Sequence, residues 1–511
     1  MDYFRPRGDI TTVLDLADRD AQDNYLFPLD TDKSWFHRGS TTNTVYPTAV
    51  SVQEFPHRGP AEFGQFFTFE LGSLPAGDLL QAIILQVRLG HWYNPDTICK
   101  LQRADLFADL SGNESAQQYW TWADSLGTSL IEYAEFVVGE QTIERLSGEF
   151  IRAFLNIFAD IDTQIGVSSD GLGNVPAPLL FVPQTNTQNS PVLQTALNPN
   201  RPWPTENGQF FCVLPFFFLR TRLKEVFPLL SCNEGNVRIN IKLRPFNQLV
   251  RNYTGFRAYC EQTPLNQQVF FKDKPNPVQT AVNPPIFQDF RILTMSVLTT
   301  GSVRESYLHR PFEQMVRLVQ TFSFDEPLKY IVSKPNSNND TIDIQLPLEL
   351  NHPVSELLWV FRRKAVHVNN EWFNFTPVVS AQYDPVKVFP PWMDSATIRI
   401  NGSEVISASG NFFREHIARK HKAGIVSYNS FVYGYSFAEY PDEHQPSGTA
   451  NMSRTNSVTI NMRVNTPIPF RVREGDKWDP EVLNGWEVFV FAIHYNWLRF
   501  ENGICNKMFS D

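Results

Sequence analysis

The chain has 511 residues, of which 42% are hydrophobic, 19% are charged and 14% are aromatic, and its formal net charge is −10. This length predicts more than one domain, and the acidic balance argues against a protein that coats nucleic acid directly, because such proteins carry a basic face. The 42 Phe, with 36 Pro and 26 Gly spread along the chain, favour an all-β fold of many short strands joined by turns.

Several segments have the hydrophobic pattern of β-strands. Leu79–Leu89 is apolar on both faces and predicts a central buried strand. Three later segments, 237–244, 342–350 and 458–464, alternate apolar and polar residues and predict strands with one buried face. The segment 486–498 is again largely apolar on both faces. One helix is predicted, over 141–161, because its apolar residues recur mostly at spacings of three and four.

Long polar connections that contain proline separate these elements. The stretch 168–201 is rich in Gly, Asn, Gln and Pro, and 262–285 is similar. Because 262–285 divides two strand-rich blocks of comparable length, we take it as the boundary between two halves. Long loops between short strands are typical of jelly rolls, which project loops from one end of the sandwich. No repeat at the level of residue identity is evident between the halves.

Motifs that carry catalytic chemistry are missing from the sequence. It contains no phosphate-binding glycine loop, no G-x-G-x-x-G after a strand, no H-E-x-x-H and no G-x-S-x-G. The short basic clusters Arg362-Arg363-Lys364 and Arg419-Lys420-His421-Lys422 are interpreted as solvated turns. We therefore predict no enzyme activity, no catalytic residues, no cofactor and no metal.

The cysteines give the same indication. Five are present, widely spaced and without a Cys-x-x-Cys pair: Cys99, Cys212, Cys232, Cys260 and Cys505. This argues against a disulfide framework and a structural zinc site, and favours a reducing compartment. The N-terminus lacks the apolar stretch of a signal peptide, and no run of about 18 apolar residues could span a membrane. We expect a soluble intracellular product.

A set of segments in chain order resembles the major capsid proteins of nucleocytoplasmic large DNA viruses, such as iridoviruses, phycodnaviruses and asfarvirus-like viruses. The most specific segment is Tyr435-Ser436-Phe437-Ala438 followed by Pro441 and the run Gln445-Pro446-Ser447-Gly448-Thr449-Ala450-Asn451-Met452-Ser453-Arg454. Shorter matches occur at Gly77-Asp78-Leu79-Leu80, Pro215-Phe216-Phe217-Phe218, Asn351-His352-Pro353-Val354 and Asn496-Trp497-Leu498-Arg499. Together they extend over roughly residues 20 to 505.

The resemblance implies an all-β double jelly roll of two eight-stranded antiparallel sandwiches with long loops and a few short helices. The expected division is an N-terminal arm over 1–36, a first jelly roll over 37–261, a linker over 262–285 and a second jelly roll over 286–511. The implied function is that of the major structural protein of an icosahedral capsid. Three copies would form a pseudo-hexameric capsomer that tiles the outer shell.

The same resemblance implies the partners and the location. The chain would bind itself as a homotrimer, then neighbouring capsomers, minor capsid and penton proteins, and a chaperone where folding requires one. It would contact no nucleic acid, and the inner membrane only indirectly. It would assemble in the host cytoplasm and reside in the outer shell of the virion.

Structural roles are expected for a small set of residues in the resembling segments. His352 and Pro353 should begin the strand that leads to Trp359, whose ring should lie in the second core. Pro446, Ser447 and Gly448, after Gln445, should form a tight turn in which glycine supplies the backbone freedom. Asn451 and Arg454 should hydrogen-bond that turn to an adjacent strand, beside Ser453, and Arg499 should pair with a loop carboxylate.

Two rival classes share the all-β composition. A carbohydrate-active enzyme or lectin would have aromatic residues and long loops, but a secreted one should show a signal peptide or disulfides. A viral tail or spike protein would be both all-β and oligomeric. The segment 445–454 argues against both classes.

Overall fold

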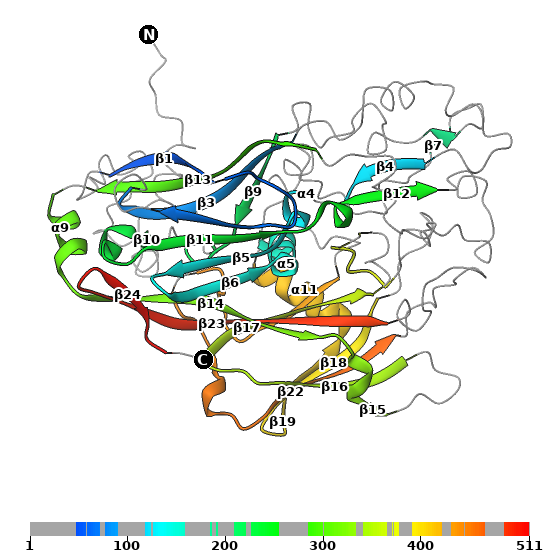
Figure 1. Ribbon diagram of the computed structural model, residues 1–511. Coiled ribbons are helices and arrows are strands. Elements are labelled where there is room, and N and C mark those ends of the chain that lie inside the picture. Colours follow the sequence, from blue (N-terminus) through cyan, green and yellow to red (C-terminus); the bar gives the residue numbers. More distant parts are fainter. Residues whose placement is uncertain are drawn as a thin grey trace, which may run out of the picture. The chain divides into compact units, whose positions relative to one another are not determined.

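The computed structural model of the chain consists of antiparallel β-sheets with a few short helices (Figure 1). Residues from Thr48 onward form one compact unit. The structure describes residues 48–57, 59–71, 77–89, 118–123, 126–158, 184–185, 191–192, 209–220, 226–254, 285–299, 301–333, 341–364, 370, 372–377, 391–421, 431–443, 445–465 and 485–509. The expected arm over 1–36, the loop 168–183 and nearly all of the expected linker lie outside these residues.

The first sandwich is built from two sheets. One has the order β1-β13-β3-β10, with β9 also paired to β3, and the other has the order β2-β11-β5-β6. The strands of the first sheet are β1 (Thr48–Pro56), β13 (Phe287–Thr299), β3 (Leu79–Leu89), β9 (Gln209–Leu214) and β10 (Phe227–Pro228). Those of the second are β2 (Phe66–Leu71), β11 (Val237–Leu243), β5 (Ile131–Val138) and β6 (Gln141–Ser147). In β11, every second residue is buried, as its alternating sequence predicts.

The second sandwich has the same construction. One sheet has the order β14-β23-β17-β20, and the other has the order β15-β16-β22-β18-β19. The first of these contains β14 (Phe312–Phe324), β23 (Trp486–Glu501), β17 (Pro353–Arg363), β20 (Val432–Ser436) and two short additions, β21 (Ala450–Asn451) and β24 (Ile504–Lys507). The other contains β15 (Ile331–Ser333), β16 (Thr341–Leu348), β22 (Val458–Asn465), β18 (Met393–Ile400) and β19 (Ser403–Ser409).

The two sandwiches have the same strand order. The main strands of the first, in chain order, are β1, β2, β3, β5, β6, β9, β11 and β13, and those of the second are β14, β16, β17, β18, β19, β20, β22 and β23. In both cases the first, eighth, third and sixth strands form one sheet, and the second, seventh, fourth and fifth form the other. This is the jelly-roll arrangement twice over. The fold expected from the resemblance is confirmed.

A helix follows the fifth strand of each sandwich. These helices are α5 (Gly148–Phe158) after β6 and α11 (Gly410–Lys420) after β19. Each begins after a serine whose Oγ accepts a hydrogen bond from a backbone N–H of the first turn: Ser147 from Phe150 at 3.2 Å and Ser409 from Phe412 at 3.4 Å. A local repeat, Ser-Gly-x-Phe-x-Arg, therefore occurs at 147–152 and 409–414. The expectation that no residue-level repeat exists was wrong at this place.

The predicted helix over 141–161 was wrong in its first third. Residues Gln141–Ser147 form β6, which pairs with β5 through a hairpin in which Gly139 has φ +61°. Ile143 and Leu146 are both buried in the strand, and their spacing of three fits a helix equally well. The helix begins only at Gly148, where the Ser147 cap marks its start.

Strand pairing divides the chain differently from the expected boundary. β13 lies after the expected linker, yet it pairs along its length with β1 and β3 of the first sandwich. Helix α9 (Gly301–His309) then connects β13 to β14. We propose that the division between the two jelly rolls falls at α9, and that residues 286–299 complete the first one.

The remaining described elements are short and lie at the ends of the sandwiches. They are the paired strands β4 (Gln118–Trp122) and β12 (Val250–Thr254), the pair β7 (Gln184–Thr185) and β8 (Pro191–Val192), helix α4 (Leu126–Ser129), and the 3₁₀ turns η5 (Leu229–Cys232), η6 (Phe246–Gln248), η8 (Pro327–Tyr330) and η10 (Met452–Arg454).

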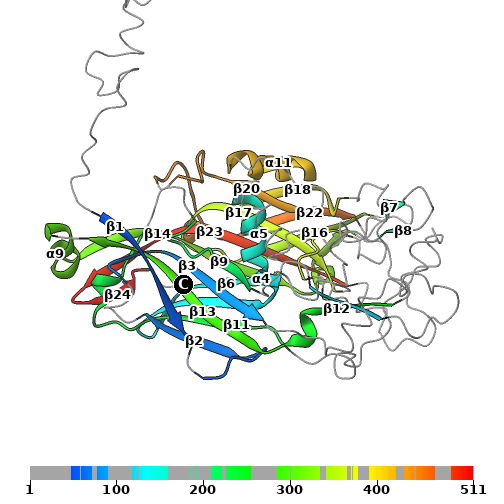
Figure 2. The ribbon, with the colours of Figure 1, turned by 90° about the horizontal axis from the view of Figure 1, so that it is seen from above.

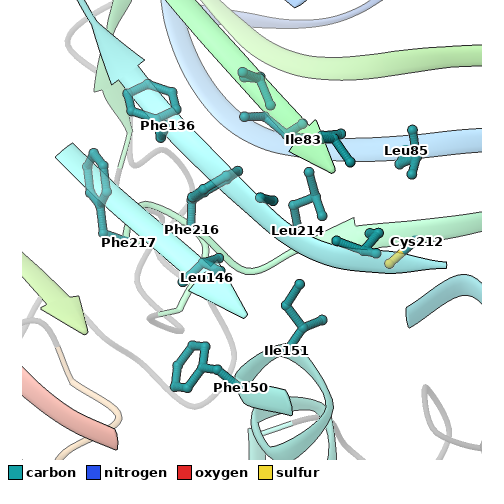
Figure 3. Packing of buried hydrophobic residues seen from close by; sticks show 14 of the residues in the cluster. Ile83, Leu85, Phe136, Leu146, Phe150, Ile151, Cys212, Leu214, Phe216 and Phe217 are labelled. Atoms are coloured by element: carbon teal, nitrogen blue, oxygen red, sulfur yellow. The ribbon is translucent and has the colours of Figure 1, made fainter. Parts of the chain in front are cut away.

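Two hydrophobic clusters fill the described part of the molecule. The second lies between the sheets of the second sandwich and contains Trp359 and Trp392. The first fills the first sandwich, where β3, β5, β6, α5, β9 and the segment after β9 contribute the side chains labelled in Figure 3. It also continues into the second sandwich, because it includes Leu358 of β17 and Phe491 of β23. The two jelly rolls are therefore joined by a shared apolar core. Figure 2 shows the strands of both sandwiches and helix α5 from above.

Candidate functional site

β17 begins where the sequence predicts, after a sharp bend at His352. This residue has a left-handed backbone, with φ +66°. Its N–H donates to Ser453 Oγ at 2.8 Å, and its carbonyl accepts from Met452 N at 3.0 Å. Pro353 is the first residue of β17, and Trp359 is fully buried in the second cluster, as expected.

The segment 446–449 does not form the expected tight turn. It is irregular and extended, and Gly448 has φ +153°. Glycine is required there for a different reason, since a Cβ at Gly448 would lie 2.5 Å from the carbonyl oxygen of Phe437. The chain passes directly over the end of β20 and then pairs with β17 as β21, with Asn451 opposite Pro353.

Two serine side chains, together with the backbone pairing of Asn451, hold this segment in place. Ser447 Oγ accepts a hydrogen bond from Tyr440 N at 2.8 Å, and Ser453 Oγ accepts the one from His352 N. Asn451 contributes through its backbone pairing and its side chain is exposed. Within the described part of the chain, neither Asn451 nor Arg454 makes a side-chain hydrogen bond. Asn451 therefore joins the segment to the adjacent strand β17, as expected, but through its backbone, whereas the structure shows no such bond for the Arg454 side chain among the described residues.

The remaining residues of the predicted set lie at the surface. Gln445 and Pro446 are exposed. Arg499 pairs with a carboxylate at 3.0 Å, but this is Glu501 of the same strand and not a loop residue. Both side chains are about half exposed, so the pair contributes little to stability. The structure thus brings together His352, Pro353, Gly448, Asn451 and Ser453 around the start of β17.

Sequence reasoning missed a buried charge cluster between the two sandwiches. Glu149 of α5 accepts hydrogen bonds through one oxygen from Arg362 at 2.7 Å and from Arg244 at 3.2 Å. Arg362 also donates to Glu487 of β23 at 2.5 Å. The guanidinium of Arg244 lies 4.3 Å from the centre of the Trp372 ring. Residues from both jelly rolls therefore meet in one hydrogen-bonded network.

The electrostatics of the cluster favour its charged form. Burial opposes ionisation of Glu149, but Arg362 and Arg244 together outweigh it, so the pKa of this carboxyl is lowered. The nearby pair of Glu144 and Arg220 behaves differently, because burial outweighs the arginine and raises the pKa of Glu144. The pKa values of these two buried carboxyl groups are therefore shifted in opposite directions.

The two basic segments that were interpreted as solvated turns contain buried side chains, although Arg419 of the second segment is exposed. Arg362 and Arg363 lie within β17, where Arg363 is fully buried, and burial lowers its pKa to about 10. At the end of α11, His421 is buried and its Nε2 lies 2.6 Å from Glu356 Oε2. The interpretation as solvated was therefore wrong for Arg362, Arg363 and His421, because the carboxylates and carbonyls that pair with these side chains lie elsewhere in the sequence.

The residues that the structure describes were also compared with the requirements of a metal site and of a membrane-spanning helix. No group of three or more His, Cys, Asp or Glu side chains there could hold a metal ion. Within the same residues, no helix is long and apolar enough to cross a membrane.

Two family models match the chain. One is described as "Major capsid protein N-terminus" and matches residues 36–270, and the other, "Large eukaryotic DNA virus major capsid protein", matches residues 311–506. Their matches cover the two strand-rich halves in turn.

Individual relatives agree with these matches. The chain is 22% identical to the major capsid protein of Phaeocystis pouchetii virus, over 91% of this chain and 93% of that one. It is 26% identical to the major capsid protein of Pyramimonas orientalis virus over 34% of this chain, which spans 41% of that relative.

Solved structures share the fold at low sequence identity. The capsid of PBCV-1 matches with a TM-score of 0.62 at 15% identity, covering 92% of this chain and 99% of that one. The Faustovirus major capsid protein matches with a TM-score of 0.60 at 13% identity, covering 90% and 92% of the two chains.

Two sandwiches of identical strand order, joined by a shared core, make this a double jelly-roll protein of the kind that builds virus capsids. The chain belongs to the family of major capsid proteins of large eukaryotic DNA viruses. Its function is structural, as the main component of the capsid of the virion.

Proposed function

We propose that three copies of the chain form a capsomer of six jelly rolls with a pseudo-hexagonal outline. The observation that carries this proposal is the duplicated strand order, because two equivalent sandwiches in one chain make three chains equivalent to six units. A near-hexagonal block can tile a flat facet by one repeated lateral contact. The capsomers then form the outer shell.

The proposal extends to the partners. Each capsomer binds neighbouring capsomers and minor capsid or penton proteins. The net charge of −10 suits a shell that does not touch the genome. Assembly takes place in the host cytoplasm, with a chaperone where folding requires one, and any contact with an inner membrane is indirect. The chain catalyses no reaction.

The test is the mass of the full-length chain in solution, followed by electron microscopy of the same material. Each chain has a mass of 58.7 kDa, so we expect a particle of about 176 kDa by light scattering, with hexagonal top views in negative stain. A stable, compact monomer over the micromolar range would contradict the proposal.

A further inference from the structure

The first sandwich has an exposed apolar sheet face. Val50 and Val52 of β1 are 60% and 58% exposed, and Phe211 and Val213 of β9 are 40% and 37% exposed. Residues directly opposite in neighbouring strands share a face. Pairs of opposite residues connect β1 to β9 across the sheet. Between β1 and β13 they are Val50 with Val297 and Val52 with Met295, between β13 and β3 Leu293 with Ile84, and between β3 and β9 Ile84 with Val213 and Gln86 with Phe211. We call this surface the open sheet face.

The equivalent face of the second sandwich is covered. Equivalent positions in the two sandwiches can be assigned from the pairing of the eighth strand with the third. An acidic residue of the eighth strand lies opposite an arginine of the third strand in both sandwiches, Asp289 opposite Arg88 in the first and Glu487 opposite Arg362 in the second. Four residues further along, Leu293 is opposite Ile84, and Phe491 is opposite Leu358. Leu358 and Phe491 are fully buried in the shared core, whereas Leu293 and Ile84 are only partly buried.

Helix α5 of the first sandwich covers the second sandwich's sheet at this point. Phe150 of α5 lies with its ring centre 5.3 Å from that of Phe491. Figure 3 shows Ile151 directed toward Leu214 inside its own sandwich, while Phe150 leaves the helix on a different side. In the Ser-Gly-x-Phe-x-Arg repeat, the residue equivalent to Phe150 is Phe412 of α11, which is 40% exposed.

Two exposed surfaces therefore correspond to the two sides of the contact between the sandwiches within one chain. The open sheet face corresponds to the covered sheet of the second sandwich, and the side of α11 that carries Phe412 corresponds to the side of α5 that carries Phe150. We propose that the open sheet face of one copy binds the α11 side of a second copy, with Phe412 seated on Leu293. The proposal rests on the capsomer proposed above and names the surfaces that hold it together. The occupant is a second copy of the chain because the chain already contains this contact once.

The chemistry of α11 fits a surface that is exposed before assembly. Where α5 has Ala153 and Ile157, both buried, α11 has the exposed residues Glu415 and Arg419. The open sheet face is likewise bordered by charges, since Arg291 pairs with Glu54 and Asp289 at its edge. An apolar centre with a polar rim is the usual composition of an interface between separately folded chains.

The geometry of this contact is head to tail. Each copy presents the open sheet face from its first sandwich and α11 from its second, so one contact leaves both surfaces available for further copies. Such heterologous contacts produce a closed ring when the rotation between copies returns to the start, and an open filament when it does not. Ring closure at three copies would make all six junctions between sandwiches equivalent.

Cysteine crosslinking tests the contact directly. One full-length chain carries Leu293→Cys, a second carries Phe412→Cys, and a third carries both, each treated with a short bismaleimide. The parent chain is the control for the native thiols, of which Cys212, Cys232 and Cys505 are buried. We expect no product from either single variant alone, a covalent dimer from their mixture, and a covalent trimer from the double variant.

Charged substitutions test the energetics of the same contact. Leu293→Glu and Phe412→Glu should each convert the trimer to monomer in light scattering. The matched control is Val332→Glu, at a valine of β15 that is 66% exposed. β15 and β19 form opposite edges of the same sheet. The Val332→Glu variant should remain trimeric. Circular dichroism of each variant establishes that the monomers are folded.

The outcomes separate the two proposals. A wild-type trimer that is not crosslinked through positions 293 and 412, and that persists in both Glu variants, would overturn the contact while leaving the capsomer intact. The Leu293→Cys thiol should react with maleimide when the chain is monomeric. If it does not react, the chain itself covers the open sheet face, and the proposed contact is overturned. A crosslinked ladder that continues beyond three copies would support the contact and contradict the trimer.

Discussion

Glu149 is the residue on which the buried charges of the junction depend. It is shared by Arg244 and Arg362, so its removal leaves two buried guanidinium groups without their common partner. We expect Glu149→Gln to lower the free energy of unfolding by about 3–5 kcal/mol at pH 7, measured by denaturant titration. The control is Asp343→Asn, in an exposed pair with Arg463, which should cost about 1 kcal/mol or less. Equal losses would contradict this account.

The pH dependence of the same variant has a definite sign. The pKa of Glu149 is lower in the folded chain than its ordinary value of about 4.3. Its contribution is therefore present above that value and is lost as the pH falls through the lower, folded-state pKa. The difference in stability between wild type and Glu149→Gln should be constant near neutral pH and shrink below about pH 4. A difference that grows on acidification would show that Glu149 is not stabilised as the anion.

Two nearby residues of the 445–454 segment, Ser453 and Asn451, should differ in how much stability their truncation to alanine costs. Ser453→Ala removes the acceptor for His352 N at the bend before β17 and should cost about 1 kcal/mol. Asn451→Ala removes an exposed side chain and should change stability by less than about 0.5 kcal/mol. Thermal melts of both variants check this. A larger effect at Asn451 would show that its side chain, and not only its backbone pairing with Pro353, holds the segment.

The resemblance to known capsid proteins identified the 445–454 segment but did not show which contacts each of its residues makes. The sequence indicated that Gly448 is required, and the structure gives the reason as the close passage over Phe437 and not a turn. Hydroxyl acceptors such as Ser453 are hard to recognise in advance, because their partner His352 is 101 residues away in the chain.

The two helices that follow the fifth strands start at equivalent glycines. A Cβ on Gly148 would lie 2.6 Å from the carbonyl oxygen of Ile131, and one on Gly410 would lie 2.1 Å from that of Met393. Ile131 and Met393 are the first residues of β5 and β18, the fourth strands of the two sandwiches. The duplication therefore preserves the close approach of a helix start to a strand start.

Alanine at either glycine should force these elements apart. We expect Gly148→Ala and Gly410→Ala each to lower the free energy of unfolding by about 1–3 kcal/mol, measured by chemical denaturation. Gly235→Ala is the control, since its Cβ would meet Val138 at an ordinary 3.5 Å. If the three variants were equally stable, the helix starts could not be as tightly packed as described.

Strands were predicted better than helices. β3, which is apolar on both faces, has the predicted bounds, and the alternating strands β11 and β22 differ from their predicted ranges by one residue at one end. The alternating strand β16 was predicted over 342–350 and spans Thr341–Leu348. The failure at β6 has a physical cause, because two buried residues three apart satisfy both a short strand and a helix. A capping serine followed by glycine was the available signal, and the second copy of it at 409–410 would have supported the assignment.

The shared core predicts how the whole chain unfolds. Leu358 and Phe491 of the second sandwich are buried in the same cluster as Phe136 and Ile151 of the first. Neither sandwich can lose its structure without exposing apolar surface of the other. We expect one calorimetric transition with equal calorimetric and van't Hoff enthalpies, in wild type and in the monomeric Leu293→Glu variant. Two separated transitions would show that the jelly rolls fold independently.

At the scale of the whole molecule, the sequence predicted the two jelly rolls but not the contact between them. Composition indicated an all-β fold, and the resembling segments indicated two jelly rolls, which the strand order confirms. The buried arginines were interpreted as solvated because a charge run is usually exposed. Their carboxylate partners, Glu149 and Glu487, are 213 and 125 residues away from Arg362, and no local pattern could reveal that pairing.

Joining two sandwiches in one chain also changes the kinetics and dilution behaviour of assembly. A ring of six separate sandwiches would form with a sixth-power dependence on concentration, and every junction would have to be found by diffusion. In the proposed ring, half of the junctions are already made within each chain at a high effective concentration, so only three bodies must meet. Capsomers would therefore accumulate from far lower amounts of newly made protein, and would survive dilution that would disperse a six-part ring.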